Sequence, residues 1–202
     1  MKREINQYSS PADQQPGSSE REQALVARVL AGERECFAEL VASHQSPIYN
    51  LALRLSGGSS EQAADLCQEI FTRCWLKLPS YDPSRPFFTW LYTLALNVIR
   101  NHQAQNRRRP SPLAGEQPET AASNADPTVA LQHQQRHEIL LTALRHLPHD
   151  QREALLLRYL QEFSFADLAA TLEISKSAAK MRVRRGLDNL RQIMARQKNC
   201  DL

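Results

Sequence analysis

The stretch from Phe163 to Arg196, FSFADLAATLEISKSAAKMRVRRGLDNLRQIMAR, predicts a short helix, a tight turn and a longer helix. Apolar residues recur with helical spacing over Phe165–Leu172. Ser164, with Asp167 three residues later, forms a capping signal at the start of this helix. Ser175 is the expected cap of the second helix. The pattern is typical of a helix-turn-helix, whose second helix enters the major groove of DNA.

The predicted second helix is strongly basic. Between Lys176 and Lys198, Asp188 is its one acidic residue. Its cations are Lys176, Lys180, Arg182, Arg184, Arg185, Arg191, Arg196 and Lys198. Its apolar positions are Ala179, Val183, Leu187, Leu190 and Met194, which we expect to face inward. The cations fit contacts with DNA phosphates, and a solvated basic face on a terminal helix is the alternative.

Composition limits the remaining possibilities. The chain has 202 residues and a net charge of +3, so the basic excess is local and the length allows one domain or two small ones. No run of about 18 apolar residues occurs, so we expect no transmembrane helix. Residues 1–20 are polar and lack the apolar segment of a signal peptide, which predicts a flexible tail and a cytoplasmic protein.

The cysteine and histidine spacings give no specific metal signal. Cys36, Cys67, Cys74 and Cys200 form no C-x-x-C pair, and a cytosolic chain would keep them reduced. Cys67 and Cys74 fit helix core positions. The pair at 133 and 137, both histidines, has i, i+4 spacing, but no third ligand is close in sequence. A solvated helix face is the alternative to a metal pair, and we expect no cofactor.

The helical periodicity predicts an all-α fold of two small domains. We expect helices at Arg21–Ala31, Glu33–Leu55, Glu61–Leu78, Arg85–Gln105, Pro127–His146, His149–Gln161, Phe165–Leu172 and Lys176–Gln197. Gly57-Gly58-Ser59 ends the second of these, and Ser59 with Gln62 forms a capping box for the third. Residues 106–126 are rich in proline and small residues, which predicts a linker between domains at 21–105 and 127–198.

Two further surfaces are predicted in the first domain. The segment from Arg85 to Arg109 is first aromatic and then basic, which fits either core packing with a charged helix end or stacking of unpaired bases. On the preceding helix, Asp65, Gln68 and Glu69 lie close to one another on one side. This acidic patch favours a basic protein partner over DNA, although many helices carry such acids for solubility alone.

Three strings together carry a resemblance to a known family. They are DLCQEIFTRCW from Asp65, FFTWLYTLALNVIRNHQAQNRRR from Phe87, and LRHLPHDQREALLLRYLQEFSFADLAATLEISKSAAKMRVRRGLDNLR from Leu144. In this order the chain resembles the bacterial sigma-70 family of RNA polymerase sigma factors. It is most similar to the small two-domain form, the extracytoplasmic-function (ECF) group, and the resemblance spans about Leu25 to Met194.

The resemblance implies the partners and the role of each patch. It implies a non-enzymatic protein that binds the β′ clamp and β flap of core RNA polymerase, contacts promoter DNA, and is controlled by an anti-sigma factor without inserting into a membrane. Asp65, Gln68 and Glu69 match the polymerase-binding positions. The positions for the minus-ten promoter element are Arg85, Phe87, Trp90, Asn97 and Arg100. Those for the minus-thirty-five element are Lys176, Lys180, Met181, Arg184 and Arg185.

The sequence departs from the family at the turn of the helix-turn-helix and on its second helix. Glu173 stands where glycine is usual, so a positive φ there would cost about 1 kcal/mol. Arg184 stands where an aromatic or aliphatic residue is common. These differences leave the minus-thirty-five sequence open.

Two other classes of protein fit this sequence less well than a sigma factor does. A stand-alone helix-turn-helix regulator would need a ligand or phosphoacceptor domain, and the first domain shows no α/β alternation. A nucleic-acid enzyme would need a metal-ligand cluster, a P-loop or a nucleophile–base pair, and the sequence offers none of these.

Overall fold

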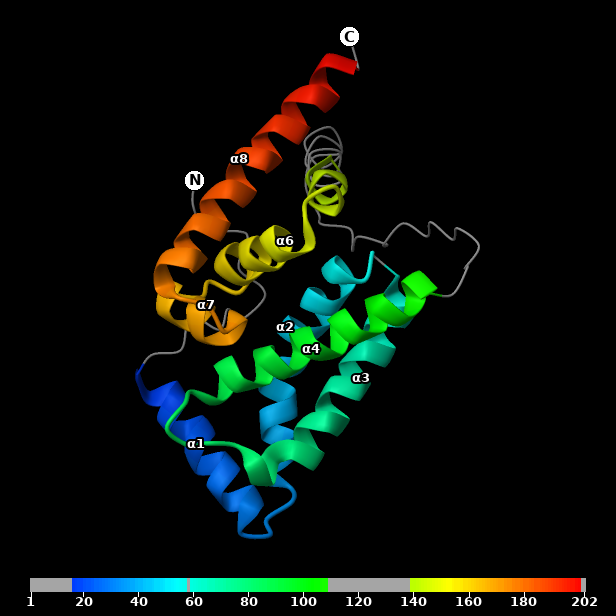
Figure 1. Ribbon diagram of the computed structural model, residues 1–202. Coiled ribbons are helices and arrows are strands. Elements are labelled where there is room, and N and C mark those ends of the chain that lie inside the picture. Colours follow the sequence, from blue (N-terminus) through cyan, green and yellow to red (C-terminus); the bar gives the residue numbers. More distant parts are fainter. Residues whose placement is uncertain (1–15, 58, 109–138, 201–202) are drawn as a thin grey trace, which may run out of the picture.

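The structure, a computed structural model, describes residues 16–57, 59–108 and 139–200 (Figure 1). Within these ranges all regular secondary structure is helical, which confirms the all-α fold. The elements are α1 (Pro16–Leu30), α2 (Cys36–Leu55), α3 (Ser60–Lys77), the 3₁₀-helix η2 (Leu78–Ser80), α4 (Phe87–Arg108), α6 (His149–Leu155), the π-helix η3 (Leu156–Leu160), α7 (Phe165–Leu172) and α8 (Lys176–Cys200). Residues 139–145 are also helical.

The predicted helices are found with shifted ends. The first begins at Pro16, inside the predicted tail, and α4 runs to Arg108, three residues into the predicted linker. The stretch predicted as one helix over His149–Gln161 is α6 followed by the π-turn η3. The rest of the predicted linker, the histidines at 133 and 137, and most of the helix predicted over 127–146 lie outside the described residues.

The first module, residues 16–108, is built around the packing of α2, α3 and α4 (Figure 1). Helix α3 starts as predicted, because the Ser59 hydroxyl accepts a hydrogen bond from the Gln62 amide at 3.2 Å. Gly57 follows α2 with φ of 97°, a conformation that costs glycine little. The buried side chains that join these helices include Leu40, Ile48, Leu51, Leu66, Ile70, Leu91 and Ile99, together with Cys67 and Cys74.

The second module, residues 139–200, contains the predicted helix-turn-helix. Ser164 caps α7 by accepting a hydrogen bond from the Asp167 amide, and Ser175 caps α8 by accepting one from the Ala178 amide, both at 3.2 Å. Glu173 ends α7 in the left-handed region with φ of 55°. The Ile174 amide then donates to the Ala169 carbonyl at 3.0 Å, which closes the turn. Glu173 therefore has the positive φ that was considered for this position from the sequence.

The close crossing of α6 and α8 in this module depends on Gly186, whose role was not predicted from the sequence. Gly186 lies on α8 against α6, where an added Cβ would be 3.1 Å from Leu155 Cγ and 3.4 Å from Gln151 Cβ. The separation from Leu155 Cγ is shorter than ordinary van der Waals contact. Glycine therefore sets how near α8 approaches α6.

The two modules are in direct contact, which the sequence did not predict. Helix α4 packs against α7 (Figure 1). One continuous cluster of buried apolar side chains runs through both modules. Phe88 and Tyr92 of α4 meet Phe163 edge to face, with ring centroids 5.2 and 5.0 Å apart. Helix α8 extends away from this contact toward the C-terminus.

Replacing Glu173 with glycine should raise the free energy of unfolding by about 1 kcal/mol, because glycine adopts φ of 55° without a Cβ clash. Urea denaturation followed by circular dichroism measures the change. Glu173→Gln is the matched control, since it removes the charge but keeps the Cβ. Equal stability of the two variants would contradict the strain at this turn.

Replacing Gly186 with valine should lower the free energy of unfolding by about 1–3 kcal/mol, because the added carbons overlap Leu155. The control is Ala195→Val, at an exposed position of the same helix, where only helix propensity changes. Thermal and urea unfolding compare the two. A Gly186→Val protein as stable as the Ala195→Val protein would show that α6 and α8 adjust without cost.

Candidate nucleic-acid interface

The exposed face of α8 brings together all five residues predicted for minus-thirty-five DNA. Lys176, Lys180, Met181, Arg184 and Arg185 are all exposed. Counted from Lys176 they stand at i, i+4, i+5, i+8 and i+9, which on a helix with 3.6 residues per turn places them in one broad stripe. The buried positions Ala179, Val183 and Gly186 occupy the opposite side, as the periodicity predicted for the first two.

The cations in this stripe are left available by their surroundings. Lys176, Arg184 and Arg185 form no ion pair with any residue that the structure describes. Lys180 lies 5.9 Å from the centroid of the Phe165 ring. Arg182, on the flank, instead pairs with Asp150 at 3.4 Å. The stripe is thus a row of uncompensated positive charge, the arrangement that phosphate contacts require.

The loop before α4 is held in place by hydrogen bonds. The Asp82 carboxylate accepts from the amide and hydroxyl of Ser84 at 2.9 and 2.8 Å, and these bonds lower its pKa. Gln23 donates to the Pro83 carbonyl at 3.0 Å, which ties the loop to α1. The Tyr81 hydroxyl donates to the carbonyl of Arg85. The loop therefore presents a fixed surface beside α4.

Phe87 does not lie on that surface, and its predicted role as a DNA contact needs correction. Its side chain is only 1% exposed, because it is the first residue of α4 and packs into the module core. Its ring lies 5.7 Å from that of Tyr81 and 5.8 Å from that of Trp90. Phe87 therefore positions Trp90, which remains partly exposed. The other aromatics divide similarly, with Tyr92 fully buried and Phe88 partly buried.

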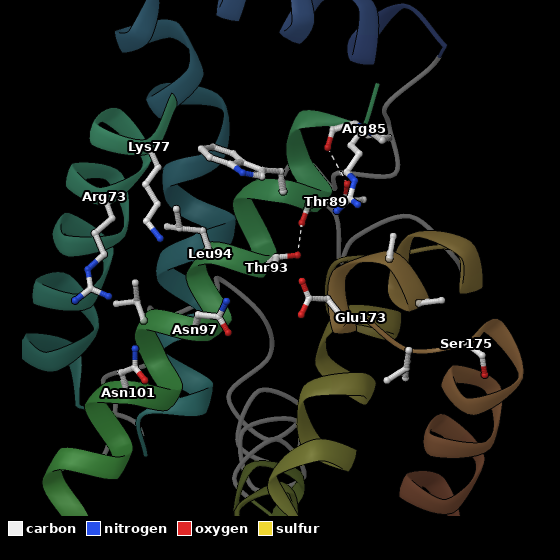
Figure 2. Close-up of a pocket in the computed structure, with 16 residues that line it drawn as sticks. Arg73, Lys77, Arg85, Thr89, Thr93, Leu94, Asn97, Asn101, Glu173 and Ser175 are labelled. Atoms are coloured by element: carbon white, nitrogen blue, oxygen red, sulfur yellow. Dashed lines mark hydrogen bonds between the residues drawn. The ribbon is translucent and has the colours of Figure 1, made fainter. Parts of the chain in front are cut away.

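Three of the other predicted minus-ten residues, Arg85, Trp90 and Asn97, line one cavity of about 1160 Å³ (Figure 2). Arg73 and Lys77 of α3 add positive charge to the same wall. The opposite wall belongs to the second module and includes Glu173, Ile174 and Ser175. In Figure 2 the Glu173 side chain points across the cavity toward Thr93 and Asn97.

Arg100 faces a different environment from the other predicted minus-ten residues. Its guanidinium donates two hydrogen bonds, at 2.8 and 2.6 Å, to the carboxylate of Glu153 on α6. Glu153 is 1% exposed and also lies 3.0 Å from His149 Nδ1. Burial raises the pKa of Glu153, but the hydrogen bonds from Arg100 and His149 outweigh it and hold that pKa below its usual value. This ion pair was not predicted from the sequence.

The predicted acidic patch lies on the exposed side of α3. Asp65 and Gln68 are exposed, and Glu69 forms an i, i+4 ion pair with Arg73 at 2.6 Å. An apolar groove of about 860 Å³ between α2 and α3 lies next to the patch, and Gln68 belongs to both. Phe37, Tyr49, Phe71 and Trp75 are among its lining residues. The charged residues of this surface were predicted from the sequence, whereas the groove was not.

The described residues show no group of three or more metal-ligating side chains. Cys36, Cys67 and Cys74 are free thiols and buried, in agreement with the packing role predicted for Cys67 and Cys74. Burial raises the pKa of Cys74 to about 12. In the part of the chain that the structure covers, every helix is too short or too polar to cross a membrane.

Comparison with protein families identifies both modules. Residues 40–109 match the family model "Sigma-70 region 2", and residues 137–190 match "Sigma-70, region 4". The first match contains the acidic patch and α4, and the second contains the helix-turn-helix.

Individual relatives match over nearly their whole length. The chain is 28% identical over 191 residues to the RNA polymerase sigma-H factor of Pseudomonas aeruginosa, covering 89% of this chain and 98% of that protein. It is 29% identical over 177 residues to the ECF RNA polymerase sigma factor SigW of Bacillus subtilis, covering 83% and 93%. It is also 29% identical over 187 residues to the ECF RNA polymerase sigma-E factor of Escherichia coli K12, covering 87% and 97%.

Solved structures share the fold. CnrH in complex with the cytosolic domain of CnrY matches with a TM-score of 0.63 and 24% identity, covering 86% of this chain and 96% of that chain. The sigma factor RpoE of Bartonella quintana, in complex with the anti-sigma factor NepR, matches with a TM-score of 0.63 and 21% identity, covering 79% and 96%. Both sigma-70 regions thus occur in the family's order along one helical chain, and this protein belongs to the sigma-70 family, in its ECF group.

Proposed function

We propose that this protein binds core RNA polymerase and directs it to specific promoters, and that each predicted surface performs one part of this task. The stripe on α8 carries the proposal. It is a row of exposed cations without ion-pair partners among the described residues, on a helix whose other side is buried in the module core. A rigid helix of this kind can enter a major groove, fix its register through phosphates and read base edges with one or two side chains.

The first module supplies the polymerase contact and the minus-ten contact. Asp65, Gln68 and Glu69 offer negative charge beside the apolar groove between α2 and α3. Such a surface suits a basic amphipathic helix of the β′ clamp, because the groove buries apolar side chains while the rim pairs with cations. Arg85, Trp90, Asn97 and Arg100 are the proposed minus-ten contacts, with Trp90 available for stacking.

The protein would act where the polymerase is, in the cytoplasm, without a cofactor or a reaction of its own. The relatives are transcription initiation factors rather than enzymes. An anti-sigma factor is the proposed inhibitor, since the solved relative from Bartonella quintana is bound to one. The β flap of the polymerase is the proposed contact of the second module.

A stand-alone helix-turn-helix regulator is the alternative, and the matches to both sigma-70 regions argue against it. Specific run-off transcripts from a promoter library, made only when core polymerase and this protein are both present, support the proposal. Tight promoter binding without polymerase, with no co-elution with core, would support the regulator instead.

Reversing charge at the acidic patch should abolish co-elution with core polymerase while leaving the helical circular dichroism spectrum unchanged. Asp65→Lys is the informative variant, because Asp65 is exposed and forms no ion pair with the described residues. Asp188→Lys is the control, since it makes the same charge change at an exposed site of α8. Equal core binding by both variants would remove the α3 patch from the polymerase interface.

Replacing Arg185 with alanine should weaken promoter binding of the polymerase complex and lower its salt dependence by about one unit of the log–log slope, as expected for one lost phosphate contact. Arg196→Ala is the control, because Arg196 is an exposed cation far along the same helix. Filter binding over a range of salt concentrations measures both. An unchanged slope for Arg185→Ala would exclude a phosphate contact by this residue.

A further inference from the structure

The contact between the two modules is polar as well as apolar. Arg100 of the first module and Glu153 of the second form a two-point ion pair at 2.8 and 2.6 Å. Glu153 is 1% exposed, whereas the Arg100 side chain is 40% exposed. A buried carboxylate is costly unless it is paired, so Glu153 favours the arrangement in which Arg100 remains beside it.

Further hydrogen bonds join the same two surfaces. Gln161, which follows η3, accepts one from the buried Tyr92 hydroxyl at 2.7 Å and donates one to the Pro47 carbonyl at 3.4 Å. The Thr93 hydroxyl lies 3.1 Å from the Thr171 carbonyl. The contact therefore has directional bonds at several points along α4, and these fix one orientation of the second module.

This orientation places the second module opposite the proposed minus-ten surface, across the cavity. Arg100 is held by Glu153 and cannot at the same time bind a phosphate with both sides of its guanidinium. Trp90 and Asn97 face a cavity whose opposite wall is the α7–α8 turn (Figure 2). The two DNA-reading parts thus lie against each other instead of against DNA.

The span of a promoter excludes the same arrangement on DNA. The minus-ten and minus-thirty-five elements are about 25 base pairs apart, which at 3.4 Å per base pair is roughly 85 Å. In this structure α4 and the second module are separated only by hydrogen-bond distances. The chain from residue 109 to residue 138 reaches roughly 100 Å when fully extended, which is enough to connect separated modules.

We propose that the Arg100–Glu153 pair and the Gln161 hydrogen bonds form an intramolecular latch, which holds this chain in a closed form that cannot engage a promoter. Opening of the latch exposes the Trp90 surface and frees Arg100. The inhibitory role rests on the proposed function, whereas the latch itself rests on the contacts alone. Because only the open fraction engages a promoter, the latch weakens the apparent affinity for promoter DNA by that fraction.

The test is the double variant Glu153→Gln/Gln161→Ala in the full chain. It removes the charge that compensates Arg100 and both hydrogen bonds of Gln161, without altering a proposed DNA or polymerase contact. The control is Asn189→Ala, which removes the 2.8 Å hydrogen bond from Asn189 to Gln151 inside the second module. The single variant Gln161→Ala serves as a milder opening variant if the double variant is unfolded by circular dichroism.

Two measurements on the protein without polymerase detect separation of the two modules, and a third measures the effect of that separation on binding. Small-angle X-ray scattering gives the radius of gyration. Acrylamide quenching of Trp90 is measured in a Trp75→Phe background, which leaves one of the two tryptophans. Titration of promoter DNA into the protein mixed with core polymerase gives the apparent affinity for the promoter. The double variant should be larger, its Trp90 more accessible, and its apparent affinity roughly fivefold higher or more, whereas Asn189→Ala should match the unmodified chain.

The outcomes separate the latch from the proposed function. An unchanged radius and unchanged Trp90 quenching in a folded opening variant would overturn the latch. A larger radius without a gain in affinity would overturn its inhibitory role. If the opening variant expands but neither it nor the unmodified chain binds core polymerase, then the proposed function has failed and the inhibitory role fails with it.

Discussion

The burial of the Glu153 carboxylate constrains the arrangement of the whole protein. A buried charge needs a partner, and Arg100 and His149 meet that need from α4 and from one turn back along α6. Arg100 can do so only while α4 lies against α6. The cavity, the Phe163 contacts and the α7–α8 turn lie along the same contact between the two modules.

Helix α4 has two roles that compete for the same side chains. In the first module it supplies core residues such as Leu91 and Ile99, which fix it against α2 and α3. Its remaining face carries Trp90, Asn97 and Arg100, which are either proposed DNA contacts or neighbours of the second module. A helix that serves both purposes lets a change in module contact alter the exposure of a binding surface without any refolding.

Local sequence signals predicted local structure well. Features that depend on residues within a few positions of one another could be predicted from the sequence. They are the capping serines at 59, 164 and 175, the αL turn at Glu173 and the α8 stripe. The inter-module contacts were not visible, since Arg100 and Glu153 are 53 residues apart and neither has an unusual local pattern. Phe87 was misplaced for a similar reason: spacing gives a helix face, but only packing decides whether that face is core.

The close approach of α6 and α8 at Gly186 has a consequence for how the family diversifies. The packing of α8 depends on Ala179, Val183 and Gly186, and none of these belongs to the exposed stripe. Substitutions in the stripe therefore alter chemistry at the surface while the supporting scaffold is preserved. With the stripe as the proposed promoter contact, separation of this kind would let a duplicated gene acquire a new target set through a few surface changes, such as at Arg184, without first losing the ability to fold.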